Sequence, residues 1–90
     1  MEFEKHCQET LQKLGNRYEE VHIWLDYYYQ FEGVSHREKR HHTNGVKEVE
    51  KLFGKEAGKA AVLHIKSDLC GDLPTPEEWK DADYWLSFFR

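Results

Sequence analysis

A chain of 90 residues with 13 Lys and Arg against 17 Asp and Glu has room for one hydrophobic core and carries a formal net charge of −4, which argues against binding DNA or RNA by charge alone. Its hydrophobic content of 39% and aromatic content of 14% exclude an intrinsically disordered chain. No apolar run is long enough to span a membrane, and the charged start Met1–Lys5 is unlike a secretory signal peptide, so we expect one cytoplasmic domain over residues 1–90 that contacts no membrane.

The first half of the chain shows the apolar spacing of helices. Apolar residues recur every three to four positions between Phe3 and Leu14, which predicts a first helix that ends at Gly15. The same spacing between Val21 and Phe31 predicts a second helix, which Gly33 closes.

A third helix is expected from about residue 36 to residue 53. Ser35 and Glu38 have the spacing of a capping box, in which a hydroxyl and a carboxylate satisfy free backbone N–H groups at a helix start. The apolar period continues across Gly45, which favours one continuous helix with a close helix contact at this glycine. Because Asn-Gly is also a strong turn dipeptide, a short loop at residues 43–45 is the alternative.

Two further helices complete the prediction. Small and apolar residues between Ala57 and Leu69 form the inner face of a fourth helix, which Gly71 ends. Thr75 and Glu78 form a second capping box. The face of a last helix consists of Trp79, Ala82, Leu86 and Phe89. Since no stretch alternates with period two, the predicted class is all-α, a compact bundle of four to five helices.

The aromatic residues are numerous for such a small domain. Trp85, Phe88 and Phe89 crowd the last six positions, and a domain of this size buries only about 60–65% of its extended-chain surface. A second copy of the chain is one way to cover them, so a homodimer or homotetramer is expected. Cys7 and Cys70 are interpreted as small core residues, with zinc ligation as the alternative.

The segment between His36 and Gly45 is basic within an acidic chain. Arg37, Arg40 and His41 are spaced to share one helical face near a helix start, where guanidinium groups and the helix dipole favour phosphate. The residues of this segment predicted to bind a phosphorylated ligand are His36, Arg37, Arg40, His41, His42, Thr43 and Asn44. A solvated basic face is the alternative.

Aromatic side chains on the second helix extend this hypothesis. A hairpin over residues 32–34 lays the second helix beside the third, so Tyr27 or Tyr28 is expected to stack on a base of the ligand. Trp24 is expected in the core.

A competing constellation is typical of metal binding. His22 and Asp26 are one helical turn apart, and so are His64 and Asp68. Imidazoles and carboxylates that converge from several helices build metal sites in bundles, and a metal-activated water would make a hydrolase. The alternative site for a divalent metal therefore comprises His22, Asp26, Glu50, His64 and Asp68, with His41 or His42 as further candidates. Buried imidazoles held by their carboxylates are the non-functional alternative.

Landmarks over residues 18–80 resemble, in their order, a family of small uncharacterised bacterial and phage domains. That family carries a His-rich helix, a Phe-Gly pair, a His-x-x-x-Asp helix and a closing Pro-Thr-x-x-x-Trp. The corresponding landmarks here are Tyr18, Val21-His22-x-Trp24-Leu25-Asp26, His36-Arg37-x-x-Arg40-His41-His42, Gly45-Val46, Glu50-x-x-Phe53-Gly54, His64-Ile65-x-x-Asp68 and Leu73-Pro74-Thr75-Pro76-Glu77-Glu78-Trp79. The family's Arg-His-Arg core is replaced by the run from His36 to His41.

In its class the chain also looks like the small helical oligomers with which phages sequester cyclic nucleotide immune signals (anti-CBASS sponges). This resemblance implies pockets between subunits, with arginines for phosphate and aromatic rings for bases, in the host cytoplasm and without turnover. The first hypothesis is therefore non-enzymatic sequestration of a cyclic (di)nucleotide without a cofactor. A metal-dependent phosphohydrolase or nuclease is the alternative, and a structural protein–protein interaction module is a third.

Overall fold

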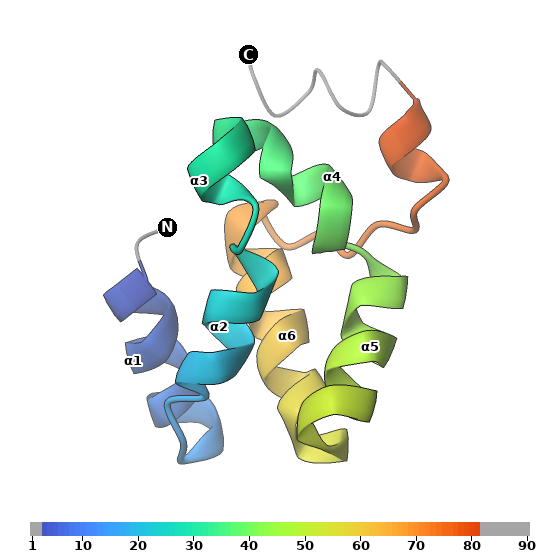
Figure 1. Ribbon diagram of the computed structural model, residues 1–90. Helices are drawn as coiled ribbons and strands as arrows, with labels where there is room; N and C mark the ends of the chain where they lie inside the picture. Colours follow the sequence, from blue (N-terminus) through green and yellow to red (C-terminus); the bar gives the residue numbers. More distant parts are fainter. Residues whose placement is uncertain (1–2, 82–90) are drawn as a thin grey trace.

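The computed structural model describes residues 3–81, and this part is built from helices and loops without a β-strand (Figure 1). Its elements in chain order are α1 (Phe3–Leu14), α2 (Glu19–Leu25), α3 (Tyr29–Glu32), the 3₁₀ turn η1 (Gly33–His36), α4 (Arg37–Arg40), α5 (Thr43–Phe53), α6 (Lys55–Asp68) and the 3₁₀ turn η2 (Glu78–Lys80). The predicted all-α class is confirmed.

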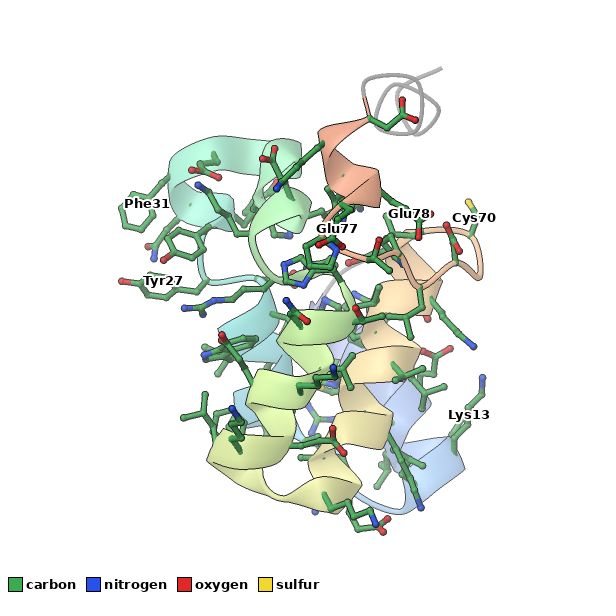
Figure 2. All side chains as sticks on the ribbon, turned by 90° about the vertical axis from the view of Figure 1, so that its right-hand side faces the viewer. Lys13, Tyr27, Phe31, Cys70, Glu77 and Glu78 are labelled. Atoms are coloured by element: carbon green, nitrogen blue, oxygen red, sulfur yellow. The ribbon has the colours of Figure 1, made fainter. Side chains whose placement is uncertain are left out.

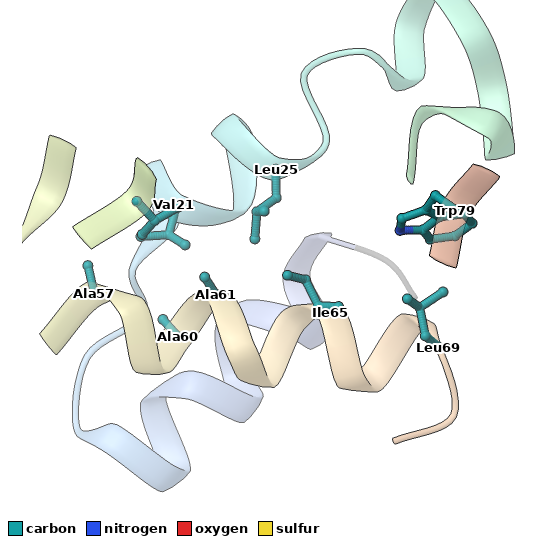
Figure 3. Close-up of a cluster of buried hydrophobic side chains, with 9 residues drawn as sticks. Val21, Leu25, Ala57, Ala60, Ala61, Ile65, Leu69 and Trp79 are labelled. Atoms are coloured by element: carbon teal, nitrogen blue, oxygen red, sulfur yellow. The ribbon is translucent and has the colours of Figure 1, made fainter. Parts of the chain in front are cut away.

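Helix α6 is the centre of the fold, because α1, α2 and α5 all pack against it (Figure 1). Its alanines leave no bulky side chain between the helices, so α2 approaches closely, and Val21 and Leu25 lie over Ala57 and Ala61 (Figure 3). All four of these residues are buried. The inner face predicted for residues 57–69 is therefore confirmed, and it aligns His64 and Asp68 with the same interior.

The second predicted helix, from Val21 to Phe31, is wrong as one element. Helix α2 ends at Leu25, and the chain turns through residues 26–28 before α3 begins. Asp26 has the backbone angles φ −97° and ψ 10°. Aspartate is a poor residue for a helix interior. Here the Asp26 carboxylate contacts histidines from other segments of the chain, and these contacts favour a helix end at this residue.

The prediction of one continuous helix over residues 36–53 is also wrong. Helix α4 ends at Arg40, His42 is extended (φ −158°, ψ 175°), and α5 begins at Thr43. The Gly45 backbone N–H donates to His42 Nδ1 at 3.0 Å, so His42 caps α5. A Cβ at Gly45 would overlap the backbone carbonyl of Arg40. The glycine therefore permits the expected close helix contact, here between α4 and α5. The alternative of a loop at residues 43–45 is also wrong, because these residues begin α5 and the chain breaks at residues 41 and 42.

One of the two predicted capping boxes is confirmed. Glu78 N–H donates to Thr75 Oγ1 at 3.3 Å and Thr75 N–H donates to Glu78 Oε1 at 3.1 Å, as predicted. The other box depends on the side chain of Ser35, which lies outside the described part of the structure; α4 begins at Arg37, after His36.

Two expectations concern the core and the last helix. Cys7 is buried, whereas Cys70 is exposed, which corrects its assignment as a core residue (Figure 2). The expected start of the last helix is wrong, because the chain forms only the short 3₁₀ turn η2 there and Asp81 is extended (φ −82°, ψ 116°). The rest of that helix and the aromatic cluster fall on residues 82–90, outside the described residues. No helix within residues 3–81 is both long and apolar enough to cross a membrane.

Candidate metal centre

Polar side chains from five separate segments converge beside the C-terminal half of α6. Asp26 follows the last turn of α2, and His64 and Asp68 lie one turn apart on α6. The other members of the cluster are His6 of α1, His36 at the end of η1 and His41 directly after α4. The four histidines are buried, the Asp68 side chain is 3% exposed and the Asp26 side chain is 29% exposed. The cluster thus lies in the interior with one side open to solvent.

The two carboxylates bring the imidazoles together. Asp26 Oδ1 lies 3.1 Å from His64 Nε2 and 3.4 Å from His41 Nε2. Asp68 Oδ2 lies 3.3 Å from His64 Nε2 and 3.0 Å from His41 Nε2. Neighbouring ligand atoms around a tetrahedral ion with bonds of about 2.0–2.1 Å are about 3.3 Å apart. Asp26, His41, His64 and Asp68 therefore have the spacing of a metal ligand set.

His36 faces the same place. Its Nδ1 lies 2.6 Å from the Gly33 carbonyl oxygen, which can only accept, so Nδ1 carries a proton. Its Nε2 lies 3.0 Å from Asp26 Oδ1, within hydrogen-bond distance of that carboxylate. A proton on Nε2 or a bound cation between the two atoms makes this contact favourable. A Nδ1–H held by a backbone carbonyl is also the usual arrangement of a metal-binding histidine.

A hydrogen-bond chain behind the cluster orients His64. The Thr10 hydroxyl lies 2.7 Å from the Arg17 carbonyl oxygen, to which it donates, so it accepts from His22 Nε2–H at 3.2 Å. His22 Nδ1 is then an acceptor, and it lies 2.8 Å from His64 Nδ1. His64 donates from Nδ1, which leaves its Nε2 available as a metal ligand between the two carboxylates.

Several buried polar atoms of the cluster lack hydrogen-bond partners. The Nδ1 atoms of His6 and His41 make no hydrogen bond, and Nε of Arg37 makes none either. An unsatisfied buried polar group costs about 1–3 kcal/mol, so such a concentration needs compensation. A bound cation would supply it for His6, whose Nε2 lies 3.2 Å from Asp68 Oδ1.

The electrostatics keep both carboxylates ionised. Burial raises the pKa of Asp26, but hydrogen bonds from His36, His41 and His64 outweigh burial and hold it well below the usual range. Burial likewise raises the pKa of Asp68, and hydrogen bonds from its histidine partners outweigh it. Burial lowers the pKa of His64, yet its bonds to the two aspartates raise it overall. A positive charge at His64 Nε2 is therefore favoured.

The open side of the cluster is a pocket of about 810 Å³. Asp26, His36 and Asp68 lie in its wall together with Arg37, whose NH2 is 3.8 Å from Asp68 Oδ1. Lys5 also lines the pocket. The aromatic and aliphatic lining consists of Phe3, Ile23, Tyr27 and Tyr29, all of them exposed. A cation site, two basic side chains and apolar walls thus share one cavity.

The residues predicted to bind phosphate separate into two groups. His36, Arg37 and Tyr27 line the pocket, and His41 belongs to the cluster behind it. Arg40 instead lies over the Trp24 ring at 4.0 Å and donates to the Trp24 carbonyl at 2.7 Å.

The remaining predicted positions are directed elsewhere. His42 caps α5, and Thr43 N–H donates to the Pro74 carbonyl at 2.9 Å. Asn44 is exposed on the first turn of α5. Tyr28 lies beneath Arg40, whose guanidinium carbon is 5.0 Å from the ring centroid. None of these four residues lines the described pocket.

The predicted metal residues are brought together with one exception. Asp26, His64 and Asp68 belong to one candidate ligand set, and His22 contacts His64 from behind. Glu50 is separate, because its side chain packs over Gly58 on α6, where a Cβ would come within 2.6 Å of Glu50 Cγ.

His6 was not among the predicted residues. Its position beside Cys7 on the apolar stripe of α1, one turn before the buried Thr10, is a signal that places a polar ring in the core.

The family is now established. A family model described as a domain of unknown function, DUF6915, matches residues 1–84. The chain belongs to the DUF6915 family. No curated protein and no solved structure matches this chain.

Proposed function

We propose that this DUF6915 domain is a metal-dependent phosphohydrolase. The observation that carries the proposal is the set formed by Asp26, His41, His64 and Asp68, whose ligand atoms all lie within 4.8 Å of one another. Two members of this set, Asp26 and Asp68, line the pocket. A divalent ion held there would lower the pKa of a bound water and stabilise negative charge on a phosphoryl group.

The residues that line the pocket favour a phosphate ester as the substrate. Arg37 faces the pocket with its Nε buried and without a hydrogen-bond partner, and Lys5 adds a second positive charge. Guanidinium groups bind phosphate oxygens through two parallel hydrogen bonds. Tyr27 and Tyr29 supply aromatic surface at the same pocket, which suits a phosphate ester with an aromatic or nucleoside group.

Sequestration of a cyclic nucleotide without turnover is the second candidate. It is favoured by the presence of Arg37 and Tyr27 in one pocket, the pairing of groups expected from the sequence. Both candidates use the same cavity, and they differ in whether the ester is cleaved.

One experiment separates the candidates. Protein stripped with a chelator is incubated with bis(4-nitrophenyl) phosphate or a cyclic dinucleotide, with and without Mn²⁺ or Zn²⁺, and the products are separated after heat denaturation. We expect cleavage that needs the ion, stops with chelator and falls to background in Asp68→Asn. Intact nucleotide recovered from the protein would overturn hydrolysis in favour of sequestration, and neither binding nor cleavage would leave an interaction module.

His42→Ala is the matched control. His42 is adjacent to His41 and is also an imidazole, but it caps α5 and does not line the pocket. Cleavage should persist in this variant.

A further inference from the structure

The relation between His6, His64 and Asp68 extends the candidate ligand set. The imidazoles of His6 and His64 are stacked with ring centroids 3.7 Å apart and an angle of 14° between their planes. His6 Nε2 lies 3.2 Å from Asp68 Oδ1, and His64 Nε2 lies 3.3 Å from Asp68 Oδ2. Two parallel rings therefore direct equivalent nitrogens toward the two oxygens of one carboxylate.

We infer that the cluster beside the pocket holds two metal ions bridged by Asp68, the first on His41, His64 and Asp26 and the second on His6. This inference rests on the proposed metal-dependent function and specifies its centre. An ion lies in the plane of the imidazole that binds it, so ions on these two rings are separated by about the ring spacing. That spacing falls in the range of about 3.5–4 Å found in two-metal sites.

The burial of His6 supports the second ion independently of the ring stacking. His6 is fully buried, and its Nδ1 makes no hydrogen bond. Its Nε2 faces Asp68 Oδ1 at 3.2 Å. An ion bound by both of these atoms would lie at this contact.

The second ion should bind more weakly than the first. Its protein ligands are His6 and one oxygen of Asp68, so water and substrate phosphate complete its coordination, as is common for Mg²⁺. Arg37 NH2 lies 3.8 Å from the same Asp68 oxygen and competes as a positive charge. A phosphate that bridges the ions reduces the surplus positive charge, so inorganic phosphate should increase occupancy of the second site.

The test counts ions and measures their coupling. Chelator-stripped protein is titrated with Mn²⁺ in the presence of inorganic phosphate, bound ions are counted by metal analysis, and the electron paramagnetic resonance spectrum is recorded at low temperature. We expect two ions per chain with the spectrum of an exchange-coupled pair. In His6→Phe, which keeps a stacked ring, the count should fall from two to one and the spectrum should become that of isolated Mn²⁺. His42→Ala should retain two coupled ions.

The outcomes are distinguishable from those of the proposed function. One ion per chain in the wild type, or two without coupling, overturns the bridged pair, and this decision needs no variant to fold. If a single ion is bound and phosphate esters are still cleaved, the proposed function stands without the second site. If no ion is bound, both fail.

Discussion

Two adjacent histidines provide the sharpest test of the metal centre. His41 is fully buried, with Nε2 3.0 Å from Asp68 and 3.4 Å from Asp26, whereas His42 is half-buried and caps α5. A ligand present at 100 times its Kd stabilises a fold by about 2.7 kcal/mol. A domain of this size gains about 4–8 °C in Tm for each kcal/mol, so Zn²⁺ at that excess should raise Tm by about 11–22 °C.

The two alanine variants should respond differently to the ion. If His41→Ala lowers affinity about 100-fold, the same Zn²⁺ concentration equals Kd and stabilises by only about 0.4 kcal/mol, an increase in Tm of about 2–3 °C. His42→Ala loses a helix cap worth about 1 kcal/mol, which lowers Tm with and without Zn²⁺ and leaves the increase intact.

Thermal unfolding followed by circular dichroism in EDTA and in Zn²⁺ measures both effects. A full Zn²⁺-induced increase in His41→Ala would refute the assignment of His41 as a ligand. An equal loss of the increase in His42→Ala would show that the effect arises from helix stability rather than coordination.

Three further predictions concern the surroundings of the site. Thr10→Val removes the acceptor that fixes the tautomer of His22, so metal affinity measured by calorimetry should fall about 10–100-fold, while Thr10→Ser should retain it. Arg37→Ala should raise KM for a phosphate ester. Arg40→Ala should instead lower Tm and leave KM unchanged, because Arg40 is held on Trp24. An increase in KM for Arg40→Ala would show that the substrate binds nearer to α3. Burial, together with the nearby His64 and His6, lowers the pKa of His22 to about 4. As the pH falls below about 6.5, His22 is therefore protonated in the unfolded chain before it is protonated in the folded protein, and this difference favours unfolding. In EDTA the stability advantage of wild type over His22→Asn should therefore shrink by about 2 kcal/mol between pH 7.5 and pH 5 in urea unfolding, and a constant difference would contradict the lowered pKa.

The sequence by itself determined the elements whose signals are local. The apolar stripe of α6 predicts a buried inner face, and the spacing of four residues places His64 and Asp68 one turn apart on that face whatever the rest of the chain does. Thr75 and Glu78 likewise form their capping box from three-residue spacing alone.

Helix ends near the site depend on distant partners. The apolar period continues past Asp26 and across His42, but α2 ends just before Asp26 and α4 ends two residues before His42. Asp26 contacts histidines 10 to 38 positions later in the chain, and His42 caps the next helix instead of extending the previous one. Helical propensity is a small term for each residue, so these contacts override it.

The assembly of the candidate metal centre was decided by tertiary structure alone. His6 meets Asp68 across 62 positions of sequence, and His41 is turned from the basic segment into the interior, beside Asp26, rather than toward a phosphate. Sequence periodicity shows which face of a helix is buried, but it carries no information about which buried faces meet. Packing of α1 and α2 against α6, and of α4 against α5, supplies that information, because it fixes which nitrogen and oxygen atoms lie within reach of a common ion.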